Sequence, residues 1–129
     1  MKILWNKQFW TVVFYTWLIA LLILTSMAFP NKITPEEESG PRWDYFEHFF
    51  LYLAIPILYF FSKGAYLNRI IKKTYQIFLI GLLFACLTEL QQFFIEGRTF
   101  NPVDLVLNTS GFIIGIPIGR ILSKKLKIA

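Results

Sequence analysis

Three stretches of the sequence carry polar side chains at a spacing that can bring them together. Asp44 and His48 are four residues apart, so both lie on one face if this stretch is helical. Glu89 lies within an otherwise apolar run, and Asp104 and Asn108 repeat the spacing of four. A histidine can act as a general base or a nucleophile, and a carboxylate can orient it or transfer a proton. These residue types indicate proton-transfer chemistry in a polar pocket.

Other polar residues near these three stretches are suited to holding a substrate. Arg98 lies between Glu89 and Asp104 in the sequence, and the fork of donors on arginine holds phosphate oxygens in a way that lysine cannot copy. Gln92 and Asn108 are candidates for neutral hydrogen bonds to the same substrate. Glu89 and Asp104 are also candidate ligands of a divalent cation, and one histidine with several acids suits Mg, Ca or Mn without requiring any of them.

The composition shows what kind of element carries these residues. The chain has 129 residues, of which 56% are hydrophobic and only 16% charged, and its mean hydropathy is +0.53. Soluble domains carry about 25% charged residues, and so short a chain cannot bury this much apolar surface in a water-soluble core. We therefore exclude a soluble enzyme and a disordered segment. The single cysteine, Cys86, excludes a disulfide scaffold.

Four apolar runs predict four membrane-spanning helices, at about residues 9–29, 43–61, 74–95 and 102–123. The connections are short, so we predict one domain over residues 1–129, an all-α integral membrane four-helix bundle. The first run also resembles a signal peptide, because Lys2 and Lys7 precede it and Ser26-Met27-Ala28 resembles a cleavage site. It is longer than the roughly 7 to 15 apolar residues of a signal peptide, so we expect the first helix to be retained, in a packing role.

The charges predict the orientation of this bundle. If both termini are cytoplasmic, ten of the 13 basic residues lie on the inner side, and the outer side holds only Lys32, Arg42 and Arg98. All eight acidic residues and the only histidine then fall in the outer loops or outer halves of the helices. The net charge of +5 is thus explained by topology, and nucleic-acid binding is not expected. We expect a multi-pass protein of the cytoplasmic membrane whose active face points outward.

Several of these residues also have purely structural interpretations. Asp44 and Glu47 have the spacing of a capping box, and Asn101-Pro102-Val103-Asp104 is typical of a helix N-terminus. Gly111 and Gly115 indicate a close helix contact, either inside one bundle or in an oligomer. Glu89 has no such explanation, since it is neither a cap nor a loop residue. An ionisable residue within a span is by default a candidate functional residue.

The polar stretches together resemble one known family, the VanZ-like membrane proteins, named for a teicoplanin-resistance accessory protein. The resemblance covers about residues 40 to 120 and rests on four separated motifs in the same order, Asp44-Tyr45-Phe46-Glu47-His48-Phe49, Glu89-Leu90-Gln91-Gln92, Gly97-Arg98 and Asp104-Leu105-Val106-Leu107-Asn108-Thr109-Ser110-Gly111. One departure is Tyr45, where many members carry Lys. The resemblance implies a bacterial cell-envelope protein and, for some members, altered susceptibility to glycopeptide or lipoglycopeptide antibiotics.

Three functions are compatible with these features. The first is a phosphoester reaction on a lipid head group, either a phospholipid or a polyprenyl-phosphate-linked precursor, in which Asp44 orients His48, Arg98 holds the phosphate, and Glu89 or Asp104 protonates the leaving group or binds a cation. The second is a non-catalytic module that binds a lipid-linked precursor or a lipoglycopeptide. The third, a small transporter, is the least favoured, because the essential Glu of the four-helix multidrug transporters lies on the first helix and this first helix has no acid.

Overall fold

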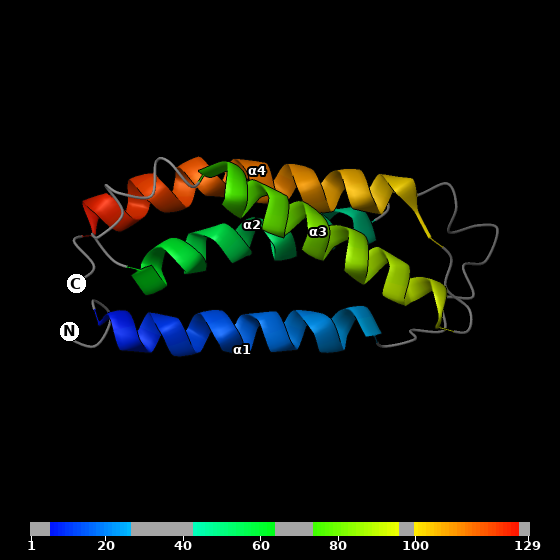
Figure 1. Ribbon diagram of the computed structural model, residues 1–129, viewed down its shortest axis with the longest axis horizontal. Helices are drawn as coiled ribbons and strands as arrows, with labels where there is room; N and C mark the ends of the chain where they lie inside the picture. The colour runs from blue at the N-terminus through cyan, green and yellow to red at the C-terminus, as the bar shows by residue number, and fades with distance from the viewer. Residues whose placement is uncertain (1–5, 27–42, 64–73, 96–99, 127–129) are drawn as a thin grey trace.

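The computed structural model describes residues 6–26, 43–63, 74–95 and 100–126, except for the side chains of Trp43, Asp44 and Gln76. Within these ranges the chain forms four helices and no strand, which confirms the all-α fold (Figure 1). The helices are α1 (Lys7–Ser26), α2 (Trp43–Lys63), α3 (Thr74–Phe93) and α4 (Pro102–Lys125). The predicted boundaries are close to the observed ones, and residues 27–29 of the predicted first helix lie outside the described residues.

Three of the described helices are long and apolar enough to cross a bilayer. They are Lys7–Ser26, Tyr45–Lys63 and Pro102–Lys125, the shortest of which has 19 residues. At about 1.5 Å per residue each spans close to the ~30 Å hydrocarbon core. The apolar stretch of α3, Ile77–Phe93, is shorter. The prediction of a span therefore holds by this criterion for α1, α2 and α4, and stays a prediction for α3.

The helices alternate in direction along one long axis (Figure 1). The start of α1 and the end of α4 lie at the same end of the bundle, and the start of α2 lies at the opposite end. The most extensive contact is between α2 and α4; α1 covers α2, and α3 packs on α4 and more lightly on α1. One end of the bundle therefore contains the starts of α1 and α3 and the ends of α2 and α4, and the opposite end contains the ends of α1 and α3 and the starts of α2 and α4.

The bundle buries a set of polar side chains beside its apolar core and exposes large apolar side chains on its outer surface. Its buried polar residues are Thr25, Ser62, Thr88, Glu89, Gln92, Asp104, Asn108 and Ser123. Large apolar side chains such as Val12, Ile80 and Val106 are more than half exposed. Such a surface suits lipid rather than water, because lipid tails solvate apolar side chains while polar groups gain from partners inside the protein.

The contact between α2 and α4 depends on glycine. A Cβ atom added at Gly111 would lie 2.2 Å from the backbone oxygen of Phe49, and one at Gly115 would lie 2.4 Å from that of Leu53. These approaches are too close for any side chain, so glycine lets the two backbones touch. Gly111 and Gly115 thus face α2 within the same chain.

Candidate functional site

A cluster of polar side chains lies at the end of the bundle where α1 and α3 end and α2 and α4 begin. His48 comes from α2, Glu89 from α3, and Asp104 and Asn108 from α4. Glu89 and Asn108 are each 0% exposed and Asp104 is 6% exposed. The residues predicted from helical spacing on three separate helices therefore meet at one place.

Asn108 is the centre of this cluster. Its Nδ2 donates a hydrogen bond of 2.9 Å to Oε1 of Glu89, and its Oδ1 lies 3.1 Å from Nδ1 of His48. An amide oxygen can only accept, so in this amide orientation Nδ1 of His48 carries a hydrogen and donates it. A neutral imidazole has one N–H, and its lone pair is therefore on Nε2.

That second nitrogen of His48 faces a carboxylate. Nε2 lies 3.8 Å from Oδ2 of Asp104, which is beyond direct hydrogen-bond distance but close enough for an ion pair once the imidazole is protonated. His48 is thus oriented by an amide on one side and lies beside a carboxylate on the other. This arrangement can accept a proton at Nε2 and stabilise the positive charge that results.

We predicted that Asp44 orients His48, and the side chain of Asp44 lies outside the described residues. The described partners of His48 are Asn108 and Asp104, and the role of Asp44 stays a prediction. Asp44 precedes His48 by four residues, and the same spacing continued beyond His48 reaches a residue that we did not predict as part of the site. Tyr52, four residues after His48, is 0% exposed, and its hydroxyl is hydrogen-bonded to that of Thr88.

Thr88 and Tyr52 line the cluster on the side of the bundle centre. The Thr88 hydroxyl also lies 3.0 Å from the backbone oxygen of Ala85, so both hydroxyls are held by neighbours. Ala85, Thr88, Glu89 and Gln92 follow one another on the buried face of α3. Tyr52 closes this face, because its ring belongs to the apolar core formed with Leu21, Ile55, Ala85 and Phe112.

Two buried polar atoms in the cluster have no hydrogen-bond partner among the described residues. They are Oε2 of Glu89 and Nε2 of Gln92, whose side chain is 3% exposed. The backbone N–H of Asn101 approaches the Glu89 carboxylate without meeting hydrogen-bond geometry. Because buried polar groups in proteins nearly always have partners, these two atoms mark a place where a bound molecule can supply them.

The start of α4 is fixed by local interactions that also position the site. Asn101 caps the helix by accepting a hydrogen bond of 3.0 Å from the backbone N–H of Val103, and Pro102 occupies the first turn, as predicted. Asp104 then lies in the first turn, where the helix dipole favours an acid, and is also directed at His48. By contrast α2 begins at Trp43, so Asp44 lies inside the first turn rather than at the cap position.

Gly111 sets the separation of α2 and α4 beside the cluster. It lies three residues after Asn108, and its α-carbon faces the backbone oxygen of Phe49, the residue that follows His48. A larger residue would push the two helices apart at the level where His48 meets Asn108. Gly111 therefore allows the backbones of α2 and α4 to approach closely enough for His48 to contact Asn108.

Two predicted features of the site are not formed by the described residues. Arg98, the predicted phosphate ligand, lies outside them. No group of three His, Cys, Asp or Glu side chains that could hold a metal ion occurs in the described part of the chain. Glu89 and Asp104 do not make such a site with the donors described.

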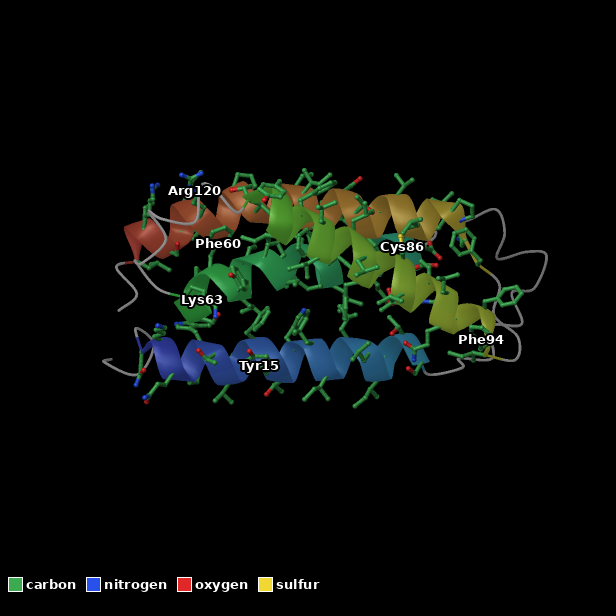
Figure 2. All side chains as sticks on the ribbon, in the orientation of Figure 1. Tyr15, Phe60, Lys63, Cys86, Phe94 and Arg120 are labelled. Atoms are coloured by element: carbon green, nitrogen blue, oxygen red, sulfur yellow. The ribbon has the colours of Figure 1, made fainter. Side chains whose placement is uncertain are left out.

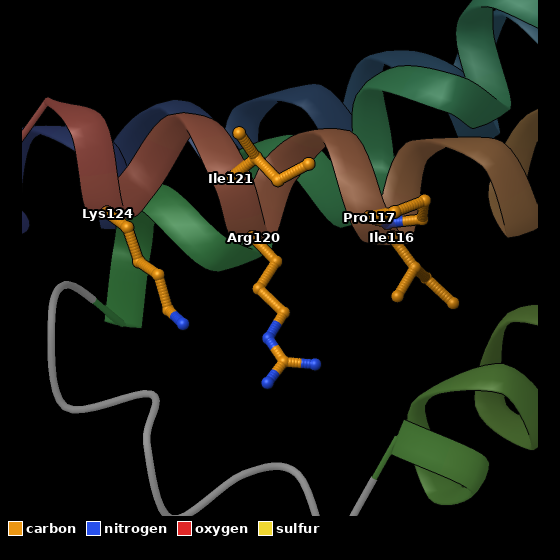
Figure 3. A pocket seen from close by; sticks show the side chains of 5 residues that line it. All are labelled: Ile116, Pro117, Arg120, Ile121 and Lys124. Carbon is orange, nitrogen blue, oxygen red and sulfur yellow. The ribbon is translucent and has the colours of Figure 1, made fainter.

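Charge separates the two ends of the bundle. The described basic residues are Lys7, Lys63, Arg120, Lys124 and Lys125, and they belong to the ends of α1, α2 and α4 opposite the cluster. Figure 2 labels Lys63 and Arg120 at that end and Phe94 at the end of the cluster. A shallow depression lined by Ile116, Pro117, Arg120, Ile121 and Lys124 lies on α4 at the basic end, remote from the cluster (Figure 3).

Comparison with protein families identifies the chain. The model of the VanZ/LLP1 family matches residues 12–123, which include every residue of the cluster. The chain belongs to the VanZ/LLP1 family. No curated protein and no solved structure matches it. Family membership and the apolar helices together make this a VanZ-type membrane protein of the cell envelope.

Proposed function

We propose that this VanZ/LLP1 protein acts on the phosphate-containing head group of a lipid at the outer leaflet, either a phospholipid or a polyprenyl-phosphate-linked precursor. One observation carries the proposal. A partly buried histidine, a buried asparagine and a buried glutamate from three helices are joined by hydrogen bonds, and a second carboxylate lies beside the other ring nitrogen of the histidine. Carboxylates inside a membrane bundle are costly, at about 2.5 to 3.5 kcal/mol near the bilayer centre, and usually mark a functional site.

The distribution of charge supports an outward orientation. The described basic residues lie at the opposite end of the bundle from His48, Glu89 and Asp104. Under the positive-inside rule the basic end is cytoplasmic, with both termini on that side, and the cluster then lies near the outer head groups. A lipid of the outer leaflet reaches such a pocket without leaving the membrane.

His48 is the general base in this proposal. Its Nε2 takes a proton from a water molecule, the water oxygen forms a bond to phosphorus, and the bond from phosphorus to the leaving oxygen breaks. The imidazolium then gives its proton to the leaving oxygen, so that protons balance. Asp104, 3.8 Å from Nε2, stabilises the imidazolium, and Asn108 keeps the ring in the required tautomer. With an alcohol in place of water the same steps exchange the head group.

The substrate contacts are assigned partly from the sequence. We assign Arg98, in the connection between α3 and α4, to the phosphate oxygens, because its donors match their geometry. Gln92, which is buried beside Glu89 on α3, supplies a neutral hydrogen bond. Glu89 is the second carboxylate, which binds the substrate by accepting a hydrogen bond from it.

The proposal is tested in cells with three variants. His48→Ala and Glu89→Gln are expected to abolish the effect of the protein on the envelope, which we propose includes lowered susceptibility to glycopeptide or lipoglycopeptide antibiotics. Glu47→Gln, an exposed acid one residue before His48, serves as the matched control and is expected to keep the effect. Immunoblotting of membranes checks that all three variants accumulate normally. A fully active His48→Ala protein contradicts the catalytic proposal.

A graded response distinguishes the second function, a binding module without catalysis. Such a module needs the same pocket but no proton transfer, so Asp104→Asn would weaken binding by a modest factor. A catalyst that loses the carboxylate beside Nε2 loses rate by orders of magnitude instead. Measurement of both binding and product formation for Asp104→Asn separates the two functions.

A further inference from the structure

We propose that the polar cluster recognises a primary ammonium group on the lipid head group, with Glu89 as its acceptor and Gln92 as the donor to a neighbouring oxygen of the same head group. This inference rests on the proposed function, since it names the class of lipid that the site accepts. The ligand is thus a zwitterionic aminophospholipid rather than an anionic lipid.

One oxygen of the Glu89 carboxylate has no hydrogen-bond partner among the described residues. Glu89 is 0% exposed, its Oε1 accepts from Asn108, and its Oε2 has no partner among the described residues. A carboxylate can only accept, and leaving an acceptor buried without a donor is unfavourable. The partner that best satisfies Oε2 is a positively charged donor, because hydrogen bonds between charged groups are the strong ones.

A hydrogen-bond donor, Nε2 of Gln92, lies on the same face of α3 as the Glu89 carboxylate. Nε2 of Gln92 is a donor without a described partner, and Gln92 follows Glu89 by three residues, about 4.5 Å along the helix axis. A ligand that satisfies both atoms must offer a donor and an acceptor a few ångströms apart. Phosphoethanolamine offers this pair, because two carbon atoms separate its ammonium group from the phosphate oxygens.

The negative charge around the cluster also favours a ligand with an ammonium group. Glu89 and Asp104 are both buried in the cluster. On the predicted outer side the whole sequence places eight acidic residues against three basic ones, Lys32, Arg42 and Arg98. An anionic head group brings one more negative charge beside two buried carboxylates, which is unfavourable at low dielectric. A zwitterionic head group brings no net charge and puts its ammonium next to them.

A lipid series on the unaltered chain tests this inference and requires no variant to fold. The purified protein is offered phosphatidylethanolamine, its N-methylated derivatives up to phosphatidylcholine, and phosphatidylglycerol, all with the same acyl chains, and the retained lipid is quantified by native mass spectrometry. We expect phosphatidylethanolamine to be retained at least about tenfold better than phosphatidylcholine, which has the same net charge but no N–H donor. Phosphatidylglycerol is expected to bind more weakly than phosphatidylethanolamine.

Two variants assign the preference to a residue. Glu89→Gln is expected to bring the ratio of phosphatidylethanolamine to phosphatidylcholine close to one, whereas Glu47→Gln, at an exposed position, keeps it. An unchanged ratio in Glu89→Gln contradicts the assignment.

The outcomes separate this inference from the proposed function. Equal retention of the two zwitterionic lipids, as expected if only water occupies the pair of atoms, overturns the ammonium inference and leaves a lipid head-group site. Preference for phosphatidylglycerol also overturns it. Retention of none of the lipids contradicts both proposals.

Discussion

The hydrogen bond between Asn108 and Glu89 makes a quantitative prediction. The bond measures 2.9 Å, and both residues are fully buried. Hydrogen bonds to charged groups contribute about 1.5 to 3 kcal/mol in soluble proteins, but coupling energies between side chains in membrane helices average about 0.6 and reach about 1.7 kcal/mol. Because one partner is a carboxylate and no water competes for it, we expect a coupling near that upper limit, about 1.5 kcal/mol.

The assay is a double-mutant cycle on unfolding in mixed detergent micelles. Asn108→Ala alone is expected to be the most damaging change, since it removes the hydrogen-bond donor to Glu89 and the acceptor for Nδ1 of His48. Adding Glu89→Ala to it costs less than Glu89→Ala costs in the original chain, and the difference is the coupling energy. Asn108→Ala combined with Thr11→Ala is the control, because Thr11 contacts Ser62 at the opposite end of the bundle. Free energies of unfolding that add within about 0.5 kcal/mol for Asn108 and Glu89 would refute the reasoning.

Two further predictions concern the packing and the orientation of the bundle. Gly115→Ala is expected to lower the free energy of unfolding by about 1 to 3 kcal/mol, because its Cβ would meet the backbone of α2 at 2.4 Å and the better helix propensity of alanine recovers only about 1 kcal/mol. The control is Ile114→Ala, at an exposed neighbouring position. If Gly115→Ala is as stable as the unaltered protein, the two helices do not pack so closely. In a Cys86→Ser background, Glu47→Cys should react with a membrane-impermeant maleimide on intact cells and Lys124→Cys only after permeabilisation; the reverse pattern contradicts an outward site.

The sequence predicted the elements and the faces of the helices well. Predominantly apolar runs long enough for a bilayer located all four helices, because few other structures accommodate such runs. The buried face of α3 consists of Gly81, Ala85, Thr88, Glu89 and Gln92, which recur every three or four residues and are small or polar, as is typical of a helix face inside a membrane bundle. Periodicity succeeds here because it depends only on the geometry of a single helix.

The pairing of residues between helices was less predictable. Periodicity gives the face of a helix but not its rotation or depth against a neighbour, so the sequence did not identify Asn108 and Asp104 as partners of His48. The role of Asp44, whose side chain lies outside the described residues, stays a prediction. Tyr52 was missed for a related reason, since a tyrosine in an apolar helix is usually a core or interfacial residue. Only its spacing of four from His48 signalled that it shares the polar face.

The central claim is that His48 performs chemistry on a lipid head group. The most direct test incubates the purified protein with phospholipids, and separately with polyprenyl-phosphate-linked precursors, with and without divalent cations, and identifies the lipid products by mass spectrometry. The account predicts loss or exchange of the head group by the unaltered protein and none by His48→Ala. Product formation that is equal in the two proteins, or absent from both while lipid is still bound, would contradict it.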